Sequence, residues 1–342
     1  MRLVAACALS LSISVAALTA AQAQISLMPS AKASAPAQPA PTPAPAAVPA
    51  PASNAAAPAS APTTTAAATP TAPLTSATAN CANPNALGVA RVVEIDTTGG
   101  PGFGFEHFKA YDFLRPGEVV LTFDDGPWPV NTPAVLAALA EQCTKAIFFT
   151  IGKHAVWHPE ILKQVAAGGH TIGTHTWSHV DLTPNSKRTI EDSKAEIEKG
   201  MSATRLSLGQ APAPFFRFPA LRHPKELVDY LGQRNVAMWS TDLDSFDFKM
   251  RKPEQVVTSV MNKLKKFGKG IILMHDFQAT TAHALPEILK QLKAGGYKVV
   301  QVKAKAPLET LVQYDDLVKK EAGGGLENAR PISSVVKTIE GE

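Results

Sequence analysis

Charged residues are nearly absent from the N-terminal part of this 342-residue sequence. Between Arg2 and Arg91 the only charged side chain is Lys32, and residues 24–86 consist mainly of alanine, proline, threonine and serine. Such a composition offers too little large apolar surface to offset the entropy lost when a chain becomes ordered. We therefore predict a disordered, partly polyproline-like linker over 24–86.

The start of the chain also lacks an apolar run long enough to span a membrane without interruption. Residues 1–23 contain a basic residue at Arg2, an apolar stretch broken by serines, and the small-residue pattern Ala21-Gln22-Ala23. This arrangement is typical of a secretory signal peptide rather than of a membrane anchor. We expect a periplasmic or secreted protein that has no stable membrane span once the signal is removed.

Clusters of lysine and arginine with interleaved aromatic residues are missing, which argues against nucleic acid as a partner. The formal net charge of +4 becomes +3 when Arg2 is removed with the signal. Cysteine is scarce, and beyond Cys7 only Cys81 and Cys143 are present. An even pair in an oxidising compartment is compatible with one disulfide, and two free thiols are the alternative.

Short β-rich runs alternate with helical patterns over the rest of the chain, which we predict to be one domain at 87–318 followed by a flexible tail at 319–342. Such alternation favours an α/β fold made of parallel βαβ units. About seven strands predict a closed or nearly closed barrel. The apolar runs lie at 119–123, 146–150, 170–174, 214–218, 236–240, 270–274 and 297–302.

Reactive side chains follow these runs at the point where each expected strand ends. In parallel barrels the chemistry lies at the carboxyl ends of the strands, where the loops gather. Structural polar residues have no reason to choose one rim, so this coincidence predicts an active site. The residues concerned are Asp124 and Asp125, His175 and His179, Arg217, Asp242 and Asp244, and His275.

The stretch HTWSH at 175–179 and the aspartate pair together predict a metal site. His175, His179 and Asp125 form a set of two histidines and one carboxylate that leaves positions open for water and substrate. Adjacent carboxylates repel each other unless a cation or a proton intervenes. We therefore expect Asp125 to bind a divalent ion, zinc first with cobalt or another ion as alternatives, and Asp124 to stay free to accept a proton.

The stretches TFDDGP, HTWSH, RFP and LMH occur in the order and spacing of the polysaccharide deacetylase family, the NodB-type carbohydrate esterases. The sequence resembles that family over roughly 115–305. The resemblance implies a distorted (β/α) barrel with seven strands. It also implies that Asp124 is the general base, that Asp125, His175 and His179 are metal ligands, that Arg217 orients the base, and that His275 is the general acid.

Two positions depart from the family pattern. Ala220 stands where the family usually has an aromatic residue whose backbone N–H helps to hold the oxyanion. That N–H survives the change, but one wall of the sugar site is lost. The stretch TDLDSFDF offers three aspartates and has Phe248 where tryptophan is commoner. The aspartate that supports His275 is therefore open among Asp242, Asp244 and Asp247, and strand-end geometry favours Asp242.

The resemblance implies a hydrolase that removes N-acetyl or O-acetyl groups from a polysaccharide, with a cell-envelope glycan as the leading candidate. Two alternatives remain. A metal-dependent phosphoesterase lacks support from a phosphate-cradling glycine loop or a second metal set. A catalytically inert carbohydrate-binding protein is suggested by Ala220 and Phe248. Nothing in the sequence indicates the oligomeric state.

Aromatic residues near the predicted rim could stack on sugar faces, and ordinary packing is an equal alternative. The remaining histidines, His107 and His154 among them, are expected to be structural or surface residues. The four aromatic candidates are Trp128, Trp177, Phe246 and Phe248.

Overall fold

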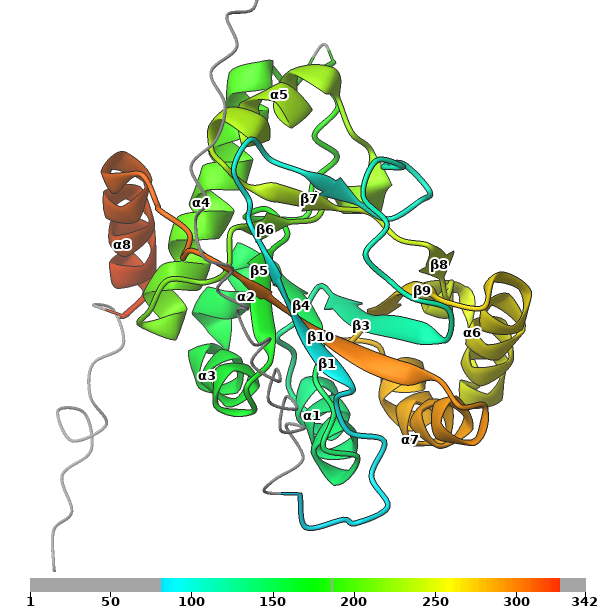
Figure 1. Ribbon diagram of the computed structural model, residues 1–342. Coiled ribbons are helices and arrows are strands. Elements are labelled where there is room, and N and C mark those ends of the chain that lie inside the picture. The colour runs from blue at the N-terminus through cyan, green and yellow to red at the C-terminus, as the bar shows by residue number, and fades with distance from the viewer. Residues whose placement is uncertain (1–80, 186, 327–342) are drawn as a thin grey trace, which may run out of the picture. The chain divides into compact units, whose positions relative to one another are not determined.

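The structure, a computed structural model, describes residues 81–185 and 187–326 (Figure 1). The chain divides into two units, 1–69 and 70–342, and all described residues belong to the second. The predicted signal peptide, linker residues 24–80 and the tail beyond 326 lie outside the described residues. Within the described ranges, no helix has both the length and the apolar character needed to cross a membrane.

Parallel strands joined by helices make up the domain, which confirms the predicted α/β architecture. Each of the seven predicted runs contains a strand, and three further short strands are present. The strands are β1 (Arg91–Ile95), β2 (Gly102–Phe103), β3 (Glu118–Asp124), β4 (Ile147–Thr150), β5 (Thr171–Thr174), β6 (Phe215–Phe216), β7 (Ala237–Trp239), β8 (Leu243–Asp244), β9 (Gly270–His275) and β10 (Lys298–Ala304).

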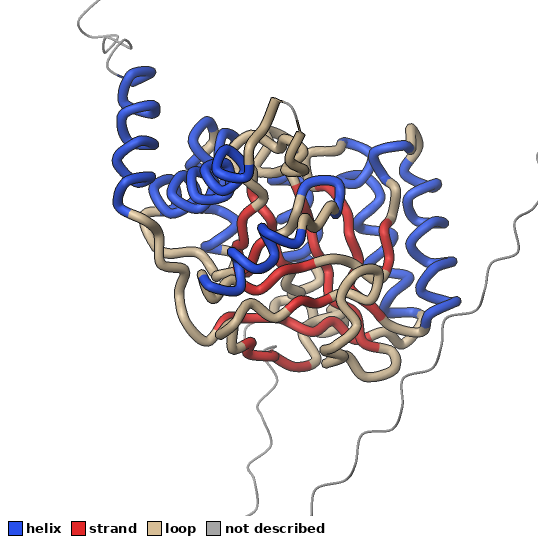
Figure 2. The backbone as a smooth tube through the Cα atoms, turned by 90° about the horizontal axis from the view of Figure 1, so that it is seen from above, coloured by secondary structure: helices blue, strands red, loops and turns tan. Residues whose placement is uncertain are grey.

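Helices flank the strands on two sides when the domain is seen from above (Figure 2). The longest, α4, begins at a capping box between Thr189 and Asp192 and ends at Gly209, which has a left-handed φ of 75°. The α-helices are α1 (Asn131–Glu141), α2 (Gly152–Trp157), α3 (Pro159–Ala167), α4 (Ile190–Leu208), α5 (Lys225–Gln233), α6 (Pro253–Phe267), α7 (Ala279–Ala294) and α8 (Val312–Leu326).

Strand β3 lies at the centre of the sheet. It pairs with β9 from Val119 to Asp124, with β4 at its carboxyl end, and with β10 at its first two residues. From β3 the order runs through β4, β5, β6 and β7 to β2, while β8 pairs with β9. No pairing joins β7 to β8 among the described residues, so the sheet is open there and any barrel is a distorted one.

The side chains of β3 alternate between the two faces of the sheet, and this alternation determines the face on which Asp124 lies. Leu121 and Phe123 pack in the apolar layer beneath helices such as α1 and α7, whereas Val120 packs inside the curved sheet. Because successive side chains of a strand point to opposite faces, Thr122 and Asp124 share the inner face with Val120. The strand therefore carries Asp124 to the inner face at its carboxyl end.

Both ends of the domain differ from the predicted boundaries. Cys81 and Cys143 form a disulfide, the first of the two alternatives, so the last residues of the predicted linker are attached to the domain. At the other end α8 continues to Leu326, past the predicted start of the tail at 319. Lys199 on α4 forms an ion pair with Glu321 on α8 at 2.8 Å.

Candidate active site and metal centre

Asp124 ends β3, Asp125 follows it, and both line one cavity of about 470 Å³. Neighbouring residues of an extended strand would point to opposite faces. Asp125 has a left-handed φ of 76°, which breaks the strand at this point. Both carboxylates consequently face the same cavity, and both are buried.

Asp125, His175 and His179 bring one ligand atom each to a common point. Asp125 Oδ1 lies 3.5 Å from His175 Nε2 and 3.4 Å from His179 Nε2. Three ligands bound tetrahedrally at about 2.0–2.1 Å from one ion would be about 3.3 Å apart. Within the described residues Asp125 Oδ1 is buried without a hydrogen-bond partner. The donor set, its spacing and this unpaired oxygen therefore fit a divalent ion of the zinc type.

His175 has a fixed tautomer. Its Nδ1–H donates to the Arg217 carbonyl at 2.6 Å, so Nε2 carries the lone pair that faces Asp125. Burial lowers the pKa of His175 well below its ordinary 6.5, helped by the neighbouring His179. The imidazole is thus neutral at pH 7, the form that binds metal.

The loop that carries both histidines is anchored on α4. Ser178 donates its backbone N–H and its hydroxyl to Glu196, at 3.0 and 2.9 Å. At Gly200 a Cβ atom would lie 2.4 Å from the Thr176 backbone, so the helix can approach the loop only with glycine at this position. Close packing on α4 therefore holds the loop that supplies two of the three candidate ligands.

Arg217 is fully buried beside Asp124. Its guanidinium donates to Asp124 Oδ1 and to Thr122 Oγ1, both at 2.7 Å, and to the Ser240 carbonyl at 2.8 Å. Burial raises the pKa of Asp124 above its ordinary 3.8, and the charge of Arg217 opposes this without cancelling it. Arg217 therefore fixes the direction of a carboxylate whose basicity is enhanced.

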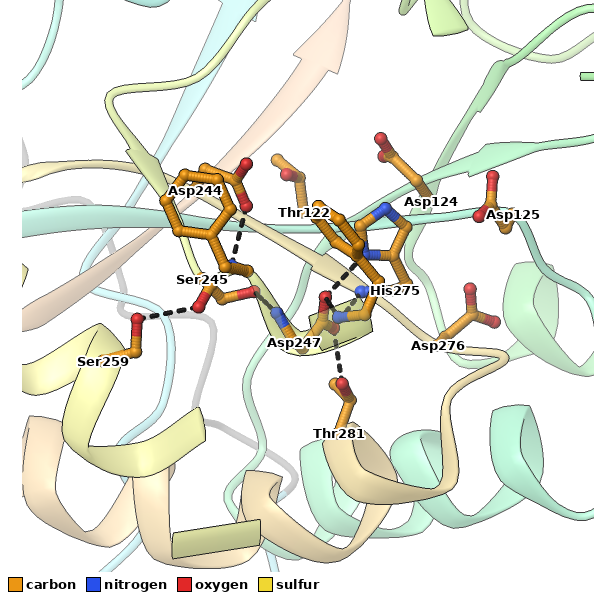
Figure 3. Close-up of polar contacts among 12 residues, drawn as sticks. Thr122, Asp124, Asp125, Asp244, Ser245, Asp247, Ser259, His275, Asp276 and Thr281 are labelled. Carbon is orange, nitrogen blue, oxygen red and sulfur yellow. Dashed lines mark hydrogen bonds and ion pairs between the residues drawn. The ribbon is translucent and has the colours of Figure 1, made fainter. Parts of the chain in front are cut away.

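His275 ends β9, beside Asp124 in register. Asp247 accepts from both its Nδ1–H, at 2.6 Å, and its backbone N–H, at 2.7 Å (Figure 3). Thr281 donates to the same carboxylate at 2.5 Å. Burial lowers the pKa of His275, but the hydrogen bond and charge of Asp247, with the charges of Asp125 and Asp124, outweigh it and raise the pKa to about 9.

The prediction that Asp242 supports His275 is wrong. The Asp242 carboxylate accepts from the backbone N–H groups of Phe105 and Ile271, at 2.6 and 2.7 Å, and so ties the segment after β2 to β9. After β8 the chain turns through Phe246, which has a left-handed φ of 56°, into a short 3₁₀ helix at Asp247–Lys249. This turn places Asp247 beneath His275, and no short-range sequence pattern distinguished it from its two neighbours.

One of the four aromatic candidates lines the cavity. Phe248 lies there, with its ring nearly perpendicular to that of His275. The other three lie outside the cavity lining, Trp128 against His154, Trp177 beneath Lys199, and Phe246 beside Lys263. Ala220 does line the cavity, with a left-handed φ of 51°.

Sequence reasoning missed several residues that support the site. His154 donates from Nδ1 to the Asp125 carbonyl at 2.6 Å, and His107 lines the cavity and contacts Ser240 Oγ at 2.7 Å. Asp276 is buried next to His275, and burial raises its pKa to about 7 against the opposing hydrogen bond from Thr132. Its position directly after the LMH stretch was the only available signal.

Comparisons with known proteins show which family this chain resembles. The family profile described as polysaccharide deacetylase matches residues 114–239. A peptidoglycan-N-acetylmuramic acid deacetylase of Bacillus subtilis is 35% identical over 189 residues, which cover 54% of this chain and 38% of that protein. A peptidoglycan-N-acetylglucosamine deacetylase of Bacillus cereus is 33% identical over 191 residues, which cover 54% of this chain and 85% of that protein.

Among solved structures, a peptidoglycan deacetylase of Bdellovibrio bacteriovorus superposes with a TM-score of 0.57 at 34% identity. The superposition covers 64% of this chain and 59% of that one. The chain thus spans 38% of the length of the first curated relative and most of the length of the Bacillus cereus protein. The residues matched by the family profile include Asp124, Asp125, His175 and His179 of the cavity.

Proposed function

The chain belongs to the polysaccharide deacetylase family, and from this membership we propose that it is a metal-dependent hydrolase that removes N-acetyl groups from a cell-envelope glycan. The observation that carries the proposal is the meeting of three units in one cavity. These units are the candidate metal ligands, the Arg217–Asp124 pair and the Asp247–His275 pair. An inert binding protein would have no need of a buried candidate base and a buried candidate acid, each with its own charged partner, beside a metal site.

An N-acetyl group is an amide, which resists attack by water. Asp125, His175 and His179 would hold the divalent ion, and the ion would supply a Lewis acid that acidifies water and polarises the carbonyl. We propose zinc, because the donor set and its spacing suit that ion. Two histidines and one aspartate leave positions open for reactants.

Asp124 takes the proton of the attacking water. Its carboxylate lies at the cavity wall, and Arg217 aims it. Burial raises its pKa, which moves it toward the range in which a general base works near neutral pH. The oxygen of the water then bonds to the carbonyl carbon, and the carbonyl oxygen becomes an oxyanion.

His275 gives a proton to the leaving nitrogen. Asp247 keeps the imidazole protonated and turns its Nε2–H toward the cavity. Donation of that proton lets the carbon–nitrogen bond break, and acetate and a free amine result. We assign the backbone N–H of Ala220, a residue of the cavity lining, the role of donor to the oxyanion while it exists.

Cell-envelope glycan is the proposed substrate class for two reasons. The predicted signal peptide directs the chain to an exported compartment. The relatives reported above are named as deacetylases of peptidoglycan, with different sugars, so the sugar unit is left open between N-acetylglucosamine and N-acetylmuramic acid.

Release of acetate from a panel of glycans tests the proposal. The panel contains peptidoglycan, chitin oligomers and O-acetylated xylan, each with zinc, with a chelator, and with zinc restored. We expect acetate release from an N-acetylated glycan, loss on chelation and recovery with zinc. Release that persists at full rate after the ion is removed contradicts the metal role, and no release from any N-acetylated glycan contradicts the proposed activity.

A further inference from the structure

Asp276 is a fully buried carboxylate for which the proposed mechanism has no use. It follows His275 directly, and within the described part of the chain it forms no ion pair with lysine, arginine or histidine. Figure 3 shows it on the side of Asp125, whereas Asp247 lies on the other side of His275. A buried carboxylate without a cation partner is costly unless hydrogen bonds compensate for its burial, so the partners of Asp276 are informative.

Both oxygens of Asp276 hold the turn that follows Asp125. Oδ1 accepts from the Gly126 backbone N–H at 3.0 Å, and Oδ2 accepts from the Thr132 hydroxyl at 2.5 Å. Thr132 Oγ1 in turn accepts from the Trp128 backbone N–H at 2.8 Å. One side chain therefore fixes the turn from 126 to 132 at both of its ends.

The turn leaves no space for adjustment at Gly126. A Cβ atom built at this position would lie 2.1 Å from Asp276 Oδ2, closer than atoms can approach. Asn131 adds a second link between the same segments, because its side-chain amide donates to the Phe277 carbonyl at 2.6 Å. Hydrogen bonds and close packing thus join the segment after β9 to the segment after β3.

These hydrogen bonds fix the peptide group between Asp125 and Gly126. His154 Nδ1 donates to its carbonyl oxygen at 2.6 Å, and Asp276 accepts from its N–H. Both polar ends of the peptide are held, which fixes its plane and the direction of the Asp125 side chain. Asp125 Oδ1 itself has no hydrogen-bond partner in the described residues, so its orientation depends on the backbone.

We propose that Asp276 is a positioning residue for the metal ligand Asp125, and that by holding the Asp125–Gly126 peptide it sets the affinity of the site for a divalent ion. The inference rests on the metal site of the proposed function. Partners that orient metal ligands typically change metal affinity by about 10- to 100-fold when they are removed. The Asp276 side chain acts on the backbone next to Asp125 rather than on the Asp125 side chain.

The test is the zinc affinity of purified apo-protein, measured by competition with a chromogenic chelator and without any glycan. Asp276→Asn keeps the volume of the side chain but cannot accept from both Gly126 and Thr132. We expect it to bind zinc roughly 10- to 100-fold more weakly than the wild type. We also expect a changed visible spectrum of the cobalt-loaded protein, because ligand geometry sets that spectrum.

Asp247→Asn is the matched control, since Asp247 is also a buried aspartate next to the same strand end but supports His275. It should bind zinc as tightly as the wild type. If Asp276→Asn does not fold, Thr132→Val removes the hydroxyl that pairs with Asp276, and Thr132→Ser restores it. We expect weaker zinc binding in the valine variant and recovery in the serine variant.

Unchanged zinc affinity in folded Asp276→Asn, or in Thr132→Val where the first variant does not fold, would overturn the inference. An equal loss in Asp247→Asn would also overturn it, because the effect would then be a general one of buried charge. A wild-type chain that binds no zinc would instead overturn the proposed metal site on which the inference rests.

Discussion

The two halves of the cavity are built by different means. In the metal half, backbone contacts orient the ligands: Asp125 and His179 have left-handed φ angles, and the Asp125 peptide is held at both ends. In the proton-transfer half, buried charged partners orient the reactive groups, Arg217 on Asp124 and Asp247 on His275. A metal ligand needs mainly a direction, because the ion supplies the charge. An acid or a base also needs a set pKa, which burial, nearby charges and hydrogen bonds provide.

The largest expected effect separates the two adjacent aspartates. Asp125→Asn should lose both bound metal and activity, because an amide is a weak ligand. Asp124→Asn should retain its metal yet be slower by about 100-fold or more, because an amide cannot accept the proton. Zinc content and acetate release measured on both variants after identical purification check this. Equal metal loss in both variants would show that the two aspartates form one shared ligand set, which would contradict the division of the cavity into two halves.

A smaller effect is expected from Asp247→Asn, which leaves every proposed catalytic group in place. Loss of the hydrogen bond and charge of Asp247 should lower the pKa of His275 from about 9. The alkaline limb of the pH profile of kcat/KM should therefore move to lower pH, with a rate loss below the roughly 100-fold expected for Asp124→Asn. A profile that keeps its alkaline limb would show that His275 is not the group that titrates there.

The same pair gives a stability prediction with a definite sign. The pKa of His275 is raised in the folded chain, from an ordinary 6.5 to about 9. Its contribution to the free energy of unfolding is therefore complete below pH 6.5 and is lost as pH rises through 9. Urea unfolding of apo-protein across this range should show the decline in the wild type and a weaker decline in Asp247→Asn. Parallel curves would contradict the prediction.

The disulfide lies outside both halves and should affect stability alone. Replacing Cys81 and Cys143 by serine should lower the free energy of unfolding by about 2–4 kcal/mol, because the unfolded chain regains the freedom of a long loop. Acetate release at 25 °C should stay unchanged. Thermal unfolding and the activity assay together check this, and a large loss of turnover at that temperature would link the disulfide to the cavity.

The smallest expected effect comes from removing the predicted linker. A chain that begins at Asn80 keeps Cys81 and the whole described domain. It should retain full turnover on soluble oligosaccharides, since residues 24–79 would serve only as a tether. Comparison of kcat on chitin oligomers checks this, and a large loss would assign the linker a part in catalysis.

Local sequence patterns predicted much of the fold and of the cavity. The seven apolar runs marked seven strands, because buried parallel strands require continuous apolar residues. The same runs placed Asp124, Asp125, His175, His179 and His275 around one cavity, with Arg217 hydrogen-bonded to Asp124 behind it. The family resemblance implied a role for each of these residues. The geometry is compatible with those roles but does not test them.

Contacts between distant segments required the tertiary structure. Asp242, Asp244 and Asp247 are equivalent in the sequence, and only the turn after β8 decides that Asp247 contacts His275. Trp177 and Phe248 are both aromatic residues near the rim, yet only Phe248 lines the cavity, because Trp177 packs against Gly152 of α2 and beneath Lys199 of α4.

The sequence by itself determined which residue types follow each strand, since the period of a strand and the apolar runs are local properties. Only the tertiary structure decided which buried side chain forms hydrogen bonds with each reactive or metal-binding residue. Asp276 meets Gly126 and Thr132 across about 150 residues of sequence, at separations of 150 and 144. The physical reason is that a buried charged group forms hydrogen bonds with the polar groups that the fold places next to it. The order of the strands in the sheet, not the order of residues in the chain, determines which groups those are.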